Sequence, residues 1–476
     1  MFKENTKILK IALIIVSIFF AIPSILFLVK NKTIYSFNGD LEFCFLLTNN
    51  INRLYQAIVY FIIISIYLSI YFLIIKYRDK IFKNINQIYL FVFVIALIFI
   101  AVLPFWCSDV FYYLGIGRLN STYHQNPYYV TMKEYIEKQA SIPNDTVIHK
   151  GYSNYWSNTT VVYGAFWTII CSIISFLSFG NIDAGIIIFK IFNTMVHLAN
   201  CYILYRLAKN KLIPLLYGLN PFILIEGIAN VHNDMYVVLF ILMALDFLVE
   251  RKKIIPSILF IALATSIKYI AILFVPLFII YHYKDKDIKT RLVKCIEYGL
   301  LYVIFCIIPY LFYARDINVF IGIITQQEKI AKGLYLFINE YFDNPKNIVQ
   351  IVKTLSLTIF SSIYICKCIA LLFSKQIDFK KEMNTLFWFL VAFIFFLITN
   401  FQPWYLIWLT VFLIWEENVK LIIKMQNMTL IANTVFLIYS ENYKYGVPFF
   451  FLLTVGILAK FPFGDGSLVG KIKNSH

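Results

Sequence analysis

The chain has 476 residues, of which 61% are hydrophobic, 18% aromatic and only 14% charged. A soluble globular domain carries about a quarter charged residues, so this composition excludes a single water-facing fold. The formal net charge is +16, but the lysines and arginines punctuate the apolar runs and do not form one basic patch. We therefore expect an all-α integral membrane protein with the lipid bilayer as its surroundings and no nucleic-acid partner.

Apolar runs of membrane-spanning length begin near the N-terminus and recur along the chain. Each is close to the roughly 20 residues that a helix needs to cross a bilayer. The first run is too long for a removable signal peptide and lacks a small-residue cleavage site, so we expect it to be a signal anchor. The runs are 8–29, 57–75, 89–105, 184–204, 292–313 and 351–373.

Clusters of basic residues between the runs predict which loops are cytoplasmic, because lysine and arginine are enriched on that side. Alternation then gives a bundle of about 13 spans, one domain over residues 1–476, and a large external loop at 106–160 after the third span. The segment 254–281 starts and ends beside basic clusters, so it must go out and return, which places Lys268 at the external side. The clusters are 76–83, 206–211, 251–253, 284–294, 375–381 and 420–424.

The first polar group of interest directly follows the third apolar run. Asp109 comes first, Tyr112 and Tyr113 lie within one helical turn of it, and Arg118 follows. A carboxylate at the mouth of a bundle is ionised at neutral pH and could accept a proton. The alternative interpretation is a helix cap or a solvated loop charge.

Later in the same loop, an aromatic and amide-rich pattern is typical of sugar recognition. Asn126-Pro-Tyr128 is followed by Tyr163 at the end of the loop. Aromatic faces stack on sugar rings, and amides bond hydroxyl groups. An interfacial aromatic belt is the competing interpretation.

Polar residues recur where further apolar segments meet. The run His232-Asn233-Asp234 is denser than turn formation requires, although Asn and Asp are common in turns. Lys268 stands inside an apolar stretch, where a lysine needs a partner or a ligand such as an anionic headgroup, unless it snorkels to the interface.

The last group is Asn400-Phe-Gln402-Pro-Trp404-Tyr405, where proline opens a helix end. A kink with an interfacial anchor is the alternative interpretation. The assigned topology brings all five groups to one membrane face. The sequence therefore predicts a single site on the external face of the cell membrane.

These motifs resemble the GT-C superfamily of polyprenyl-phosphate-sugar-dependent glycosyltransferases. The closest resemblance is to the bacterial mannosyltransferases that use polyprenol-phosphate mannose and build cell-envelope mannans. The motifs follow the order of that family over about residues 106–405. They are Asp109 with Tyr112 and Gly117-Arg118, Asn126-Pro-Tyr128, Tyr163-Gly164, Asn220-Pro221, His232-Asn-Asp234, Lys268, and Gln402-Pro-Trp-Tyr405.

The resemblance implies a hexosyltransferase, with mannose favoured, whose donor is a polyprenyl-phosphate sugar and whose acceptor is a glycan or lipid. It assigns the general base to Asp109. We expect Lys268 and Arg118 to bind the donor phosphate, and the other residues of these motifs to hold the sugar or the acceptor. The chain lacks the Asp-x-Asp motif of some superfamily members, so no cofactor and no metal ligand are predicted, although a divalent metal stays possible. The prolines that flank Tyr-Gly in the family are also missing.

Two other functions fit parts of the pattern. A lipid-linked glycan flippase or transporter would carry ionisable groups near the bilayer midplane, as Lys190 and His197 could provide. An envelope polysaccharide polymerase or ligase would share the external loop but would need more external arginines to bind a diphosphate.

Overall fold

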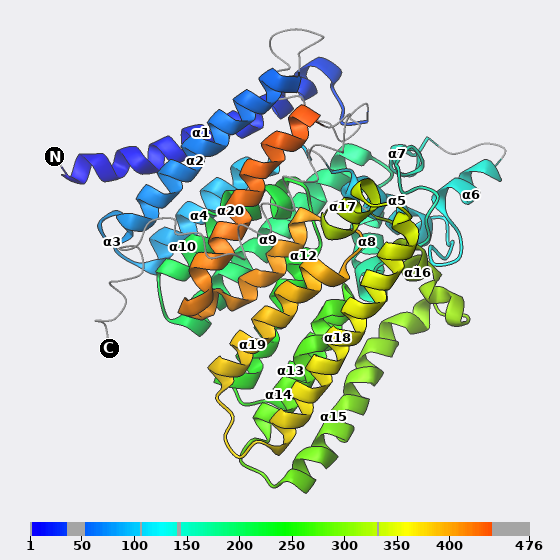
Figure 1. The fold of residues 1–476 in the computed structure, drawn as a ribbon. Coiled ribbons are helices and arrows are strands. Elements are labelled where there is room, and N and C mark those ends of the chain that lie inside the picture. Colours follow the sequence, from blue (N-terminus) through cyan, green and yellow to red (C-terminus); the bar gives the residue numbers. More distant parts are fainter. Residues whose placement is uncertain (1, 36–52, 105–106, 140–143, 331–332, 440–476) are drawn as a thin grey trace.

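A computed structural model describes residues 2–35, 53–104, 107–139, 144–330 and 333–439, and these residues are helical with no strand among them (Figure 1). The predicted external loop at 106–160 is therefore described except for Trp106 and residues 140–143. The first helices are α1 (Phe2–Asn31), α2 (Arg53–Lys76), α3 (Arg78–Ile81), α4 (Ile85–Ile100), α5 (Asp109–Ser121), α6 (Met132–Glu137), α7 (Thr146–Tyr152), α8 (Ala165–Leu177), α9 (Ile182–Ala208) and α10 (Leu212–Gly218).

The remaining elements include short 3-10 and π-helical segments, labelled η. They are α11 (Pro221–Ile223), η1 (Leu224–Ala229), α12 (Asp234–Leu245), η2 (Asp246–Glu250), α13 (Ile254–Thr265), η3 (Tyr269–Phe274), α14 (Val275–His282), α15 (Ile288–Ile307), η4 (Ile308–Phe312), η5 (Ile317–Phe320), α16 (Ile321–Gln327), α17 (Gly333–Tyr341), α18 (Pro345–Phe373), α19 (Phe379–Ala392), η6 (Phe393–Leu397), η7 (Pro403–Ile414) and α20 (Glu416–Tyr439).

Within the described ranges, five helices are long and apolar enough to cross a membrane. A sixth is counted if Leu212–Gly218 and Pro221–Ala229 are taken as one span, with a bend of 44° at the break between them. The expectation of about 13 spans, and of a loop that follows the third, is not confirmed, because several apolar helices are only 10–17 residues long. The five are Lys7–Asn31, Tyr55–Lys76, Ile182–Ala208, Ile288–Phe312 and Pro345–Phe373.

Side-chain caps fix several helix starts. Asn181 accepts a hydrogen bond from the Ala184 backbone at the start of α9, and Asp378 accepts two at the start of α19. Such caps satisfy backbone N–H groups that have no partner inside the helix. Local sequence therefore decides where these helices begin.

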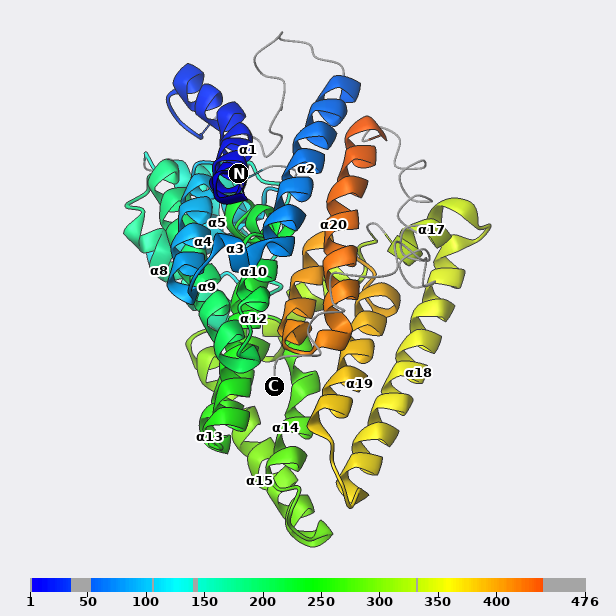
Figure 2. The same ribbon diagram turned by 90° about the vertical axis from the view of Figure 1, so that its left-hand side faces the viewer.

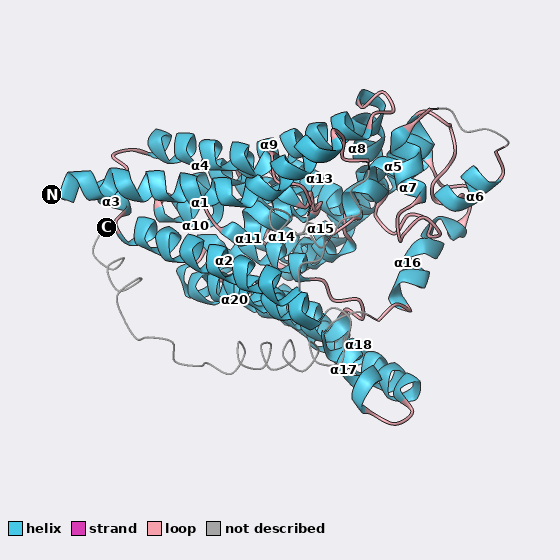
Figure 3. Cartoon of the chain, turned by 90° about the horizontal axis from the view of Figure 1, so that it is seen from above, coloured by secondary structure: helices cyan, strands magenta, loops and turns pink. Residues whose placement is uncertain are grey.

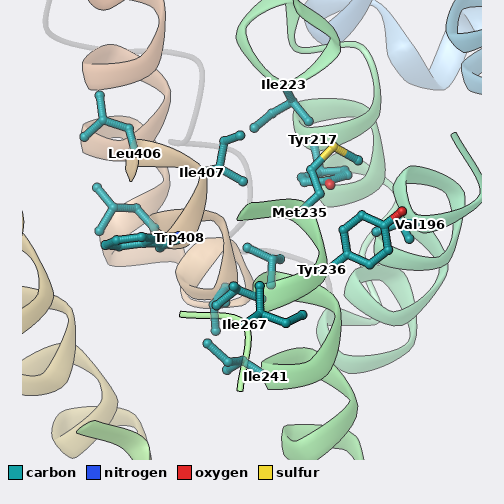
Figure 4. Close-up of a cluster of buried hydrophobic side chains, with 14 of the residues drawn as sticks. Val196, Tyr217, Ile223, Met235, Tyr236, Ile241, Ile267, Leu406, Ile407 and Trp408 are labelled. Atoms are coloured by element: carbon teal, nitrogen blue, oxygen red, sulfur yellow. The ribbon is translucent and has the colours of Figure 1, made fainter. Parts of the chain in front are cut away.

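The buried core lies where α9, α12 and η7 meet, and Figure 4 shows part of it. Val196 of α9, Met235 and Tyr236 of α12, and Ile407 of η7 are all buried there. The amide of Asn193 on α9 donates to the carbonyl of Gly227 at 2.6 Å and accepts from the Tyr236 hydroxyl at 2.9 Å. A polar side chain inside the core thus ties α9 to both η1 and α12.

Three helix interruptions face one region of the molecule. One is at Ser266–Lys268, between α13 and η3, as expected for a segment that turns back at Lys268. A second follows η1, where Val231 adopts a φ of +64°, a strained value for a β-branched residue. The third precedes η7. Interruptions leave side chains and backbone groups pointing into the space between helices, so they are where a site can form.

The views from several sides agree on the arrangement. Figures 1 and 2 place α1 and α2 toward the top of the molecule and α13 to α15 toward the bottom. Seen from above, α6, α7 and α16 gather at the end opposite the N-terminus (Figure 3). Helix α5 packs on α7 and α8, which carries its first residue, Asp109, into the bundle from that end.

Candidate active site

The site begins with the carboxylate at the first position of α5. Asp109 Oδ2 accepts a hydrogen bond from the Tyr113 hydroxyl, one turn later, at 3.5 Å. The Tyr113 hydroxyl also lies 3.3 Å from the Tyr163 hydroxyl. Burial raises the pKa of Asp109 above its usual range, while the charges of His232 and Lys268 partly oppose that rise. Asp109 is thus a largely buried carboxylate, 13% exposed, with a raised pKa.

An imidazole lies between this carboxylate and a second one. His232 Nδ1 is 3.9 Å from Asp109 Oδ2, and Nε2 is 3.2 Å from Glu226 Oε2. Neither ring nitrogen has a well-directed hydrogen bond among the described residues, although the side chain is completely buried. The ring stacks on Trp404, with centroids 3.9 Å apart and planes at 17°. The ring plane is therefore fixed by stacking, while its nitrogens face acidic groups.

A buried ion pair completes the charged set. Lys268 Nζ lies 2.7 Å from Asp234 Oδ1, and the Lys268 side chain is 12% exposed while that of Asp234 is fully buried. The ammonium also sits 4.7 Å from the centre of the Tyr405 ring and 5.3 Å from that of Trp408. Aromatic faces attract a cation. Lys268 is thus fixed by an ion pair and two aromatic rings, and it lines the same cavity as Asp109.

Two adjoining cavities lie at this point. The smaller, of about 50 Å³, is called the polar cavity here after Asp109 and Gln402 in its lining, and the larger, of about 310 Å³, the apolar cavity after Leu357, Phe393 and Leu397. Lys268 lies on the boundary between them and lines both. Residues that line only the polar cavity are Asp109, Tyr112, Trp156, Thr159, Gln402 and Trp404. Residues that line only the apolar cavity are Ile267, Tyr269, Ile323, Lys353, Leu357, Phe393, Leu397, Ile398 and Thr399. Those shared by both are Val162, Tyr163, Lys268, Gln326, Asn400 and Tyr405.

Most of the residues singled out in the sequence meet here. Seven line one or both cavities, namely Asp109, Tyr112, Tyr163, Lys268, Gln402, Trp404 and Tyr405. Tyr113, His232 and Asp234 contact that set directly. Asn233 is fully buried, and both polar atoms of its side chain lack a hydrogen-bond partner among the described residues. The structure therefore brings side chains from separate segments together around these two cavities.

Three predicted residues lie apart from the cavities. Arg118 Nε pairs with Asp145 Oδ2 at 2.6 Å. Arg118 itself lies about 13 Å along α5 from Asp109 at the usual helical rise per residue. Asn126 donates to the Tyr313 carbonyl at 2.6 Å and lines a separate surface cavity. The hydroxyl of Tyr128 donates to the Tyr163 carbonyl at 2.9 Å, so Tyr128 supports the site from behind. The structure does not bring Arg118 near Lys268.

Some residues of the cavities carry no sequence motif. Gln326 lines both cavities and Thr159 lines the polar one, whereas Asn400, which also lines both, opens the Asn400–Tyr405 group. Gln326 belongs to the region between α15 and α18, which has neither strong apolar periodicity nor a recognisable pattern. Glu226, which faces His232, lines neither cavity but lies in the same polar stretch of sequence, between Asn220-Pro221 and His232-Asn233-Asp234. That place between two polar motifs is the signal that could have found it.

Three side chains could hold a metal ion. Donor atoms of Cys107, Asp109 and His232 all lie within 4.8 Å of one another. Thiolate, carboxylate and imidazole are a set that zinc accepts. The expectation of no metal ligand, which left a divalent metal open, stays a prediction.

Lys190 and His197, which a transporter could use, have structural contacts instead. Lys190 donates to the Val102 carbonyl. His197 stacks on Tyr217 with centroids 5.0 Å apart, and its Nε2 lies 3.1 Å from the Gly218 carbonyl. Both side chains therefore join α9 to neighbouring segments.

Known proteins are similar to this chain over parts of its length. A family model described as alpha-(1->6)-mannopyranosyltransferase, N-terminal domain, matches residues 31–284, which is more than half of the chain. The alpha-(1->6)-mannopyranosyltransferase A of Corynebacterium glutamicum is 27% identical over 192 residues. That alignment covers 39% of this chain and 36% of the relative, so the chain matches about a third of the relative's length. No solved structure matches the chain.

Proposed function

The chain belongs to the alpha-(1->6)-mannopyranosyltransferase family, and from this premise we propose that it transfers a hexose, mannose by preference, from a polyprenyl-phosphate sugar to a glycan or lipid acceptor. The observation that carries the proposal is the pair of adjoining cavities, with Asp109 at the polar one and Lys268 between the two. A polyprenyl-phosphate sugar has a polar head and an apolar tail. Its phosphate lies between the two, and Lys268 is among the residues that line both cavities.

The apolar cavity suits the isoprenoid chain. Its lining comes from the segment before Lys268, from α16, α18 and η6, and includes Leu357, Phe393 and Leu397. Burial of apolar surface stabilises such contacts by about 25 cal/mol per Å². The long helices α15 and α18 expose apolar side chains such as Leu300 and Leu355, so the whole donor stays within reach of lipid.

Lys268 would meet the phosphate. Its ion pair with Asp234 and its position above the rings of Tyr405 and Trp408 hold the ammonium at the boundary of the two cavities. An ammonium has three N–H donors, so Asp234 can take one while others turn toward a phosphate oxygen. The charge stabilises the phosphate as it leaves.

Asp109 would act as the general base. The acceptor hydroxyl passes its proton to the Asp109 carboxylate while its oxygen forms a bond to the anomeric carbon. The bond from that carbon to the phosphate oxygen breaks, and its electron pair leaves with the phosphate. A single displacement of this kind inverts the anomeric configuration. Proton transfer to a positioned base contributes about 10² to 10⁴ in rate.

We place the site on the external face of the cell membrane, with the chain as a multi-pass protein. Support comes from the positions of basic residues around α13 and the η3–α14 segment. The cluster 251–253 directly precedes α13, the cluster 284–294 follows α14, and Lys268 lies where α13 and the η3–α14 segment join. If the basic clusters are cytoplasmic, the junction faces the other side.

The experiment uses membranes that contain the full chain and radiolabelled polyprenyl-phosphate mannose or glucose. We expect label to enter an acceptor with the wild type, and transfer to fall by at least 10²-fold in Asp109→Asn. Asp285→Asn, at an exposed carboxylate, is the matched control and should keep wild-type activity. Full activity in Asp109→Asn would remove the base assignment. Movement of the lipid-linked sugar across the membrane without transfer would instead favour a flippase.

A further inference from the structure

Helix α16 covers the place where the two cavities join, and a glycine lets it approach. A Cβ atom on Gly322 would lie 2.4 Å from the Val161 carbonyl oxygen and 2.9 Å from that of Thr160. Both are backbone atoms next to Val162 and Tyr163, which line the cavities. No side chain fits at position 322 without moving α16 outward.

Contacts on both sides of α16 hold it in this position. The Tyr129 hydroxyl accepts hydrogen bonds from the backbone N–H groups of Arg315 and Asp316 at 2.9 and 3.1 Å, just before η5, which leads into α16. Just after it, Lys329 Nζ lies 4.2 Å from the centre of the Trp156 ring. Trp156 itself lines the polar cavity. The helix is thus fixed over the site by residues of the 107–163 region.

The face of α16 that meets the cavities carries Ile323 and Gln326, which are three residues apart and so share one side of the helix. Ile323 lines the apolar cavity, and Gln326 lines both. The amide oxygen Oε1 of Gln326 is buried and has no hydrogen-bond partner among the described residues. A buried acceptor without a donor costs free energy, so a ligand that supplies a donor is favoured there.

We propose that Gln326 determines sugar specificity by accepting, at Oε1, a hydrogen bond from one hydroxyl of the donor hexose. This inference rests on the proposed function. Gln326 shares both cavities with Lys268, so it lies where the sugar joins the phosphate. Asp109 and Gln402 line only the polar cavity, where the proposed function puts the rest of the sugar and the acceptor hydroxyl. A donor with a hydroxyl in another orientation leaves the Oε1 atom unpaired.

The test measures kcat/KM of the full-length protein with polyprenyl-phosphate mannose and with its 2-, 3-, 4- and 6-deoxy analogues. The wild type should lose about tenfold or more with one particular analogue. Gln326→Leu should lose a similar factor with the natural donor and should no longer discriminate against that analogue. Gln326→Glu keeps an acceptor oxygen at the same position and should still discriminate. Thr325→Ala, at an exposed position of the same helix, is the matched control.

Gly322→Ala is the second variant. Because this substitution displaces α16, it should weaken the discrimination among the donors. Adding Gln326→Leu to it should then cause little further loss of that discrimination. Size-exclusion profiles in detergent show that each variant is folded. The proposal is overturned if the wild type is active and Gln326→Leu discriminates among the five donors as the wild type does. If the wild type transfers no sugar from any of these donors, the proposed function fails first.

Discussion

The buried pair of Lys268 and Asp234 allows stability and donor binding to be separated. Lys268→Met leaves the fully buried Asp234 carboxylate without the ammonium that lies 2.7 Å from it. Removing one partner of a buried ion pair costs about 3–5 kcal/mol, because the other charge stays buried and uncompensated. Asp234→Asn should be destabilising to a similar degree, since the Lys268 side chain is only 12% exposed.

The double variant Lys268→Met/Asp234→Asn removes both charges and should recover at least half of the stability lost by either single variant. The measurement is the thermal unfolding midpoint in one detergent, where each single change should lower the midpoint by on the order of 5 °C. Transfer should not recover, since the phosphate still lacks its cation. The outcome that refutes the reasoning is an additive loss of stability in the double variant, or a double variant with normal use of the donor.

Three further outcomes are expected. Transfer should fall as the pH falls through the pKa of Asp109, which burial raises, and a pH profile without an acidic limb would contradict the base role. Arg118→Gln should lower the free energy of unfolding by up to about 3–5 kcal/mol, because its ion pair with Asp145 is lost. The KM for the donor should stay unchanged. A raised KM would instead support a role for Arg118 in binding the donor phosphate. Transfer should survive EDTA, because Lys268 supplies the positive charge, whereas a loss that zinc restores would give Cys107 a role as a ligand.

The elements that sequence predicted well are those whose signal is local. The runs at 8–29, 57–75, 184–204 and 351–373 lie inside α1, α2, α9 and α18. A long apolar stretch has few alternatives to a helix. The interruption at Lys268 also follows from local features. Basic clusters bound the apolar segment 254–281, which is too long for one span and too short for two full spans.

What sequence could not provide depends on long-range pairing. Arg118 has its partner 27 residues away, and nothing in the spacing indicates that Asp145 would be that partner. Gln326 reaches the site only because Gly322 packs on the backbone of Thr160 and Val161. The number of spans was inferred by alternation, and short helices such as α8 and α13 make alternation unreliable. Convergence of the polar motifs was predictable, but their exact neighbours were not.

Because side chains of the site come from interruptions between helices, the geometry of the site depends on the thickness of the bilayer. Lys268, His232 and Gln402 belong to three separate breaks, each placed by the tilt and depth of its flanking helices. A thinner or thicker hydrocarbon layer changes tilt at modest cost, and every such change alters the spacing of these side chains. Reconstitution in lipids of graded acyl length should therefore give an optimum in turnover, with weaker donor discrimination on either side of it.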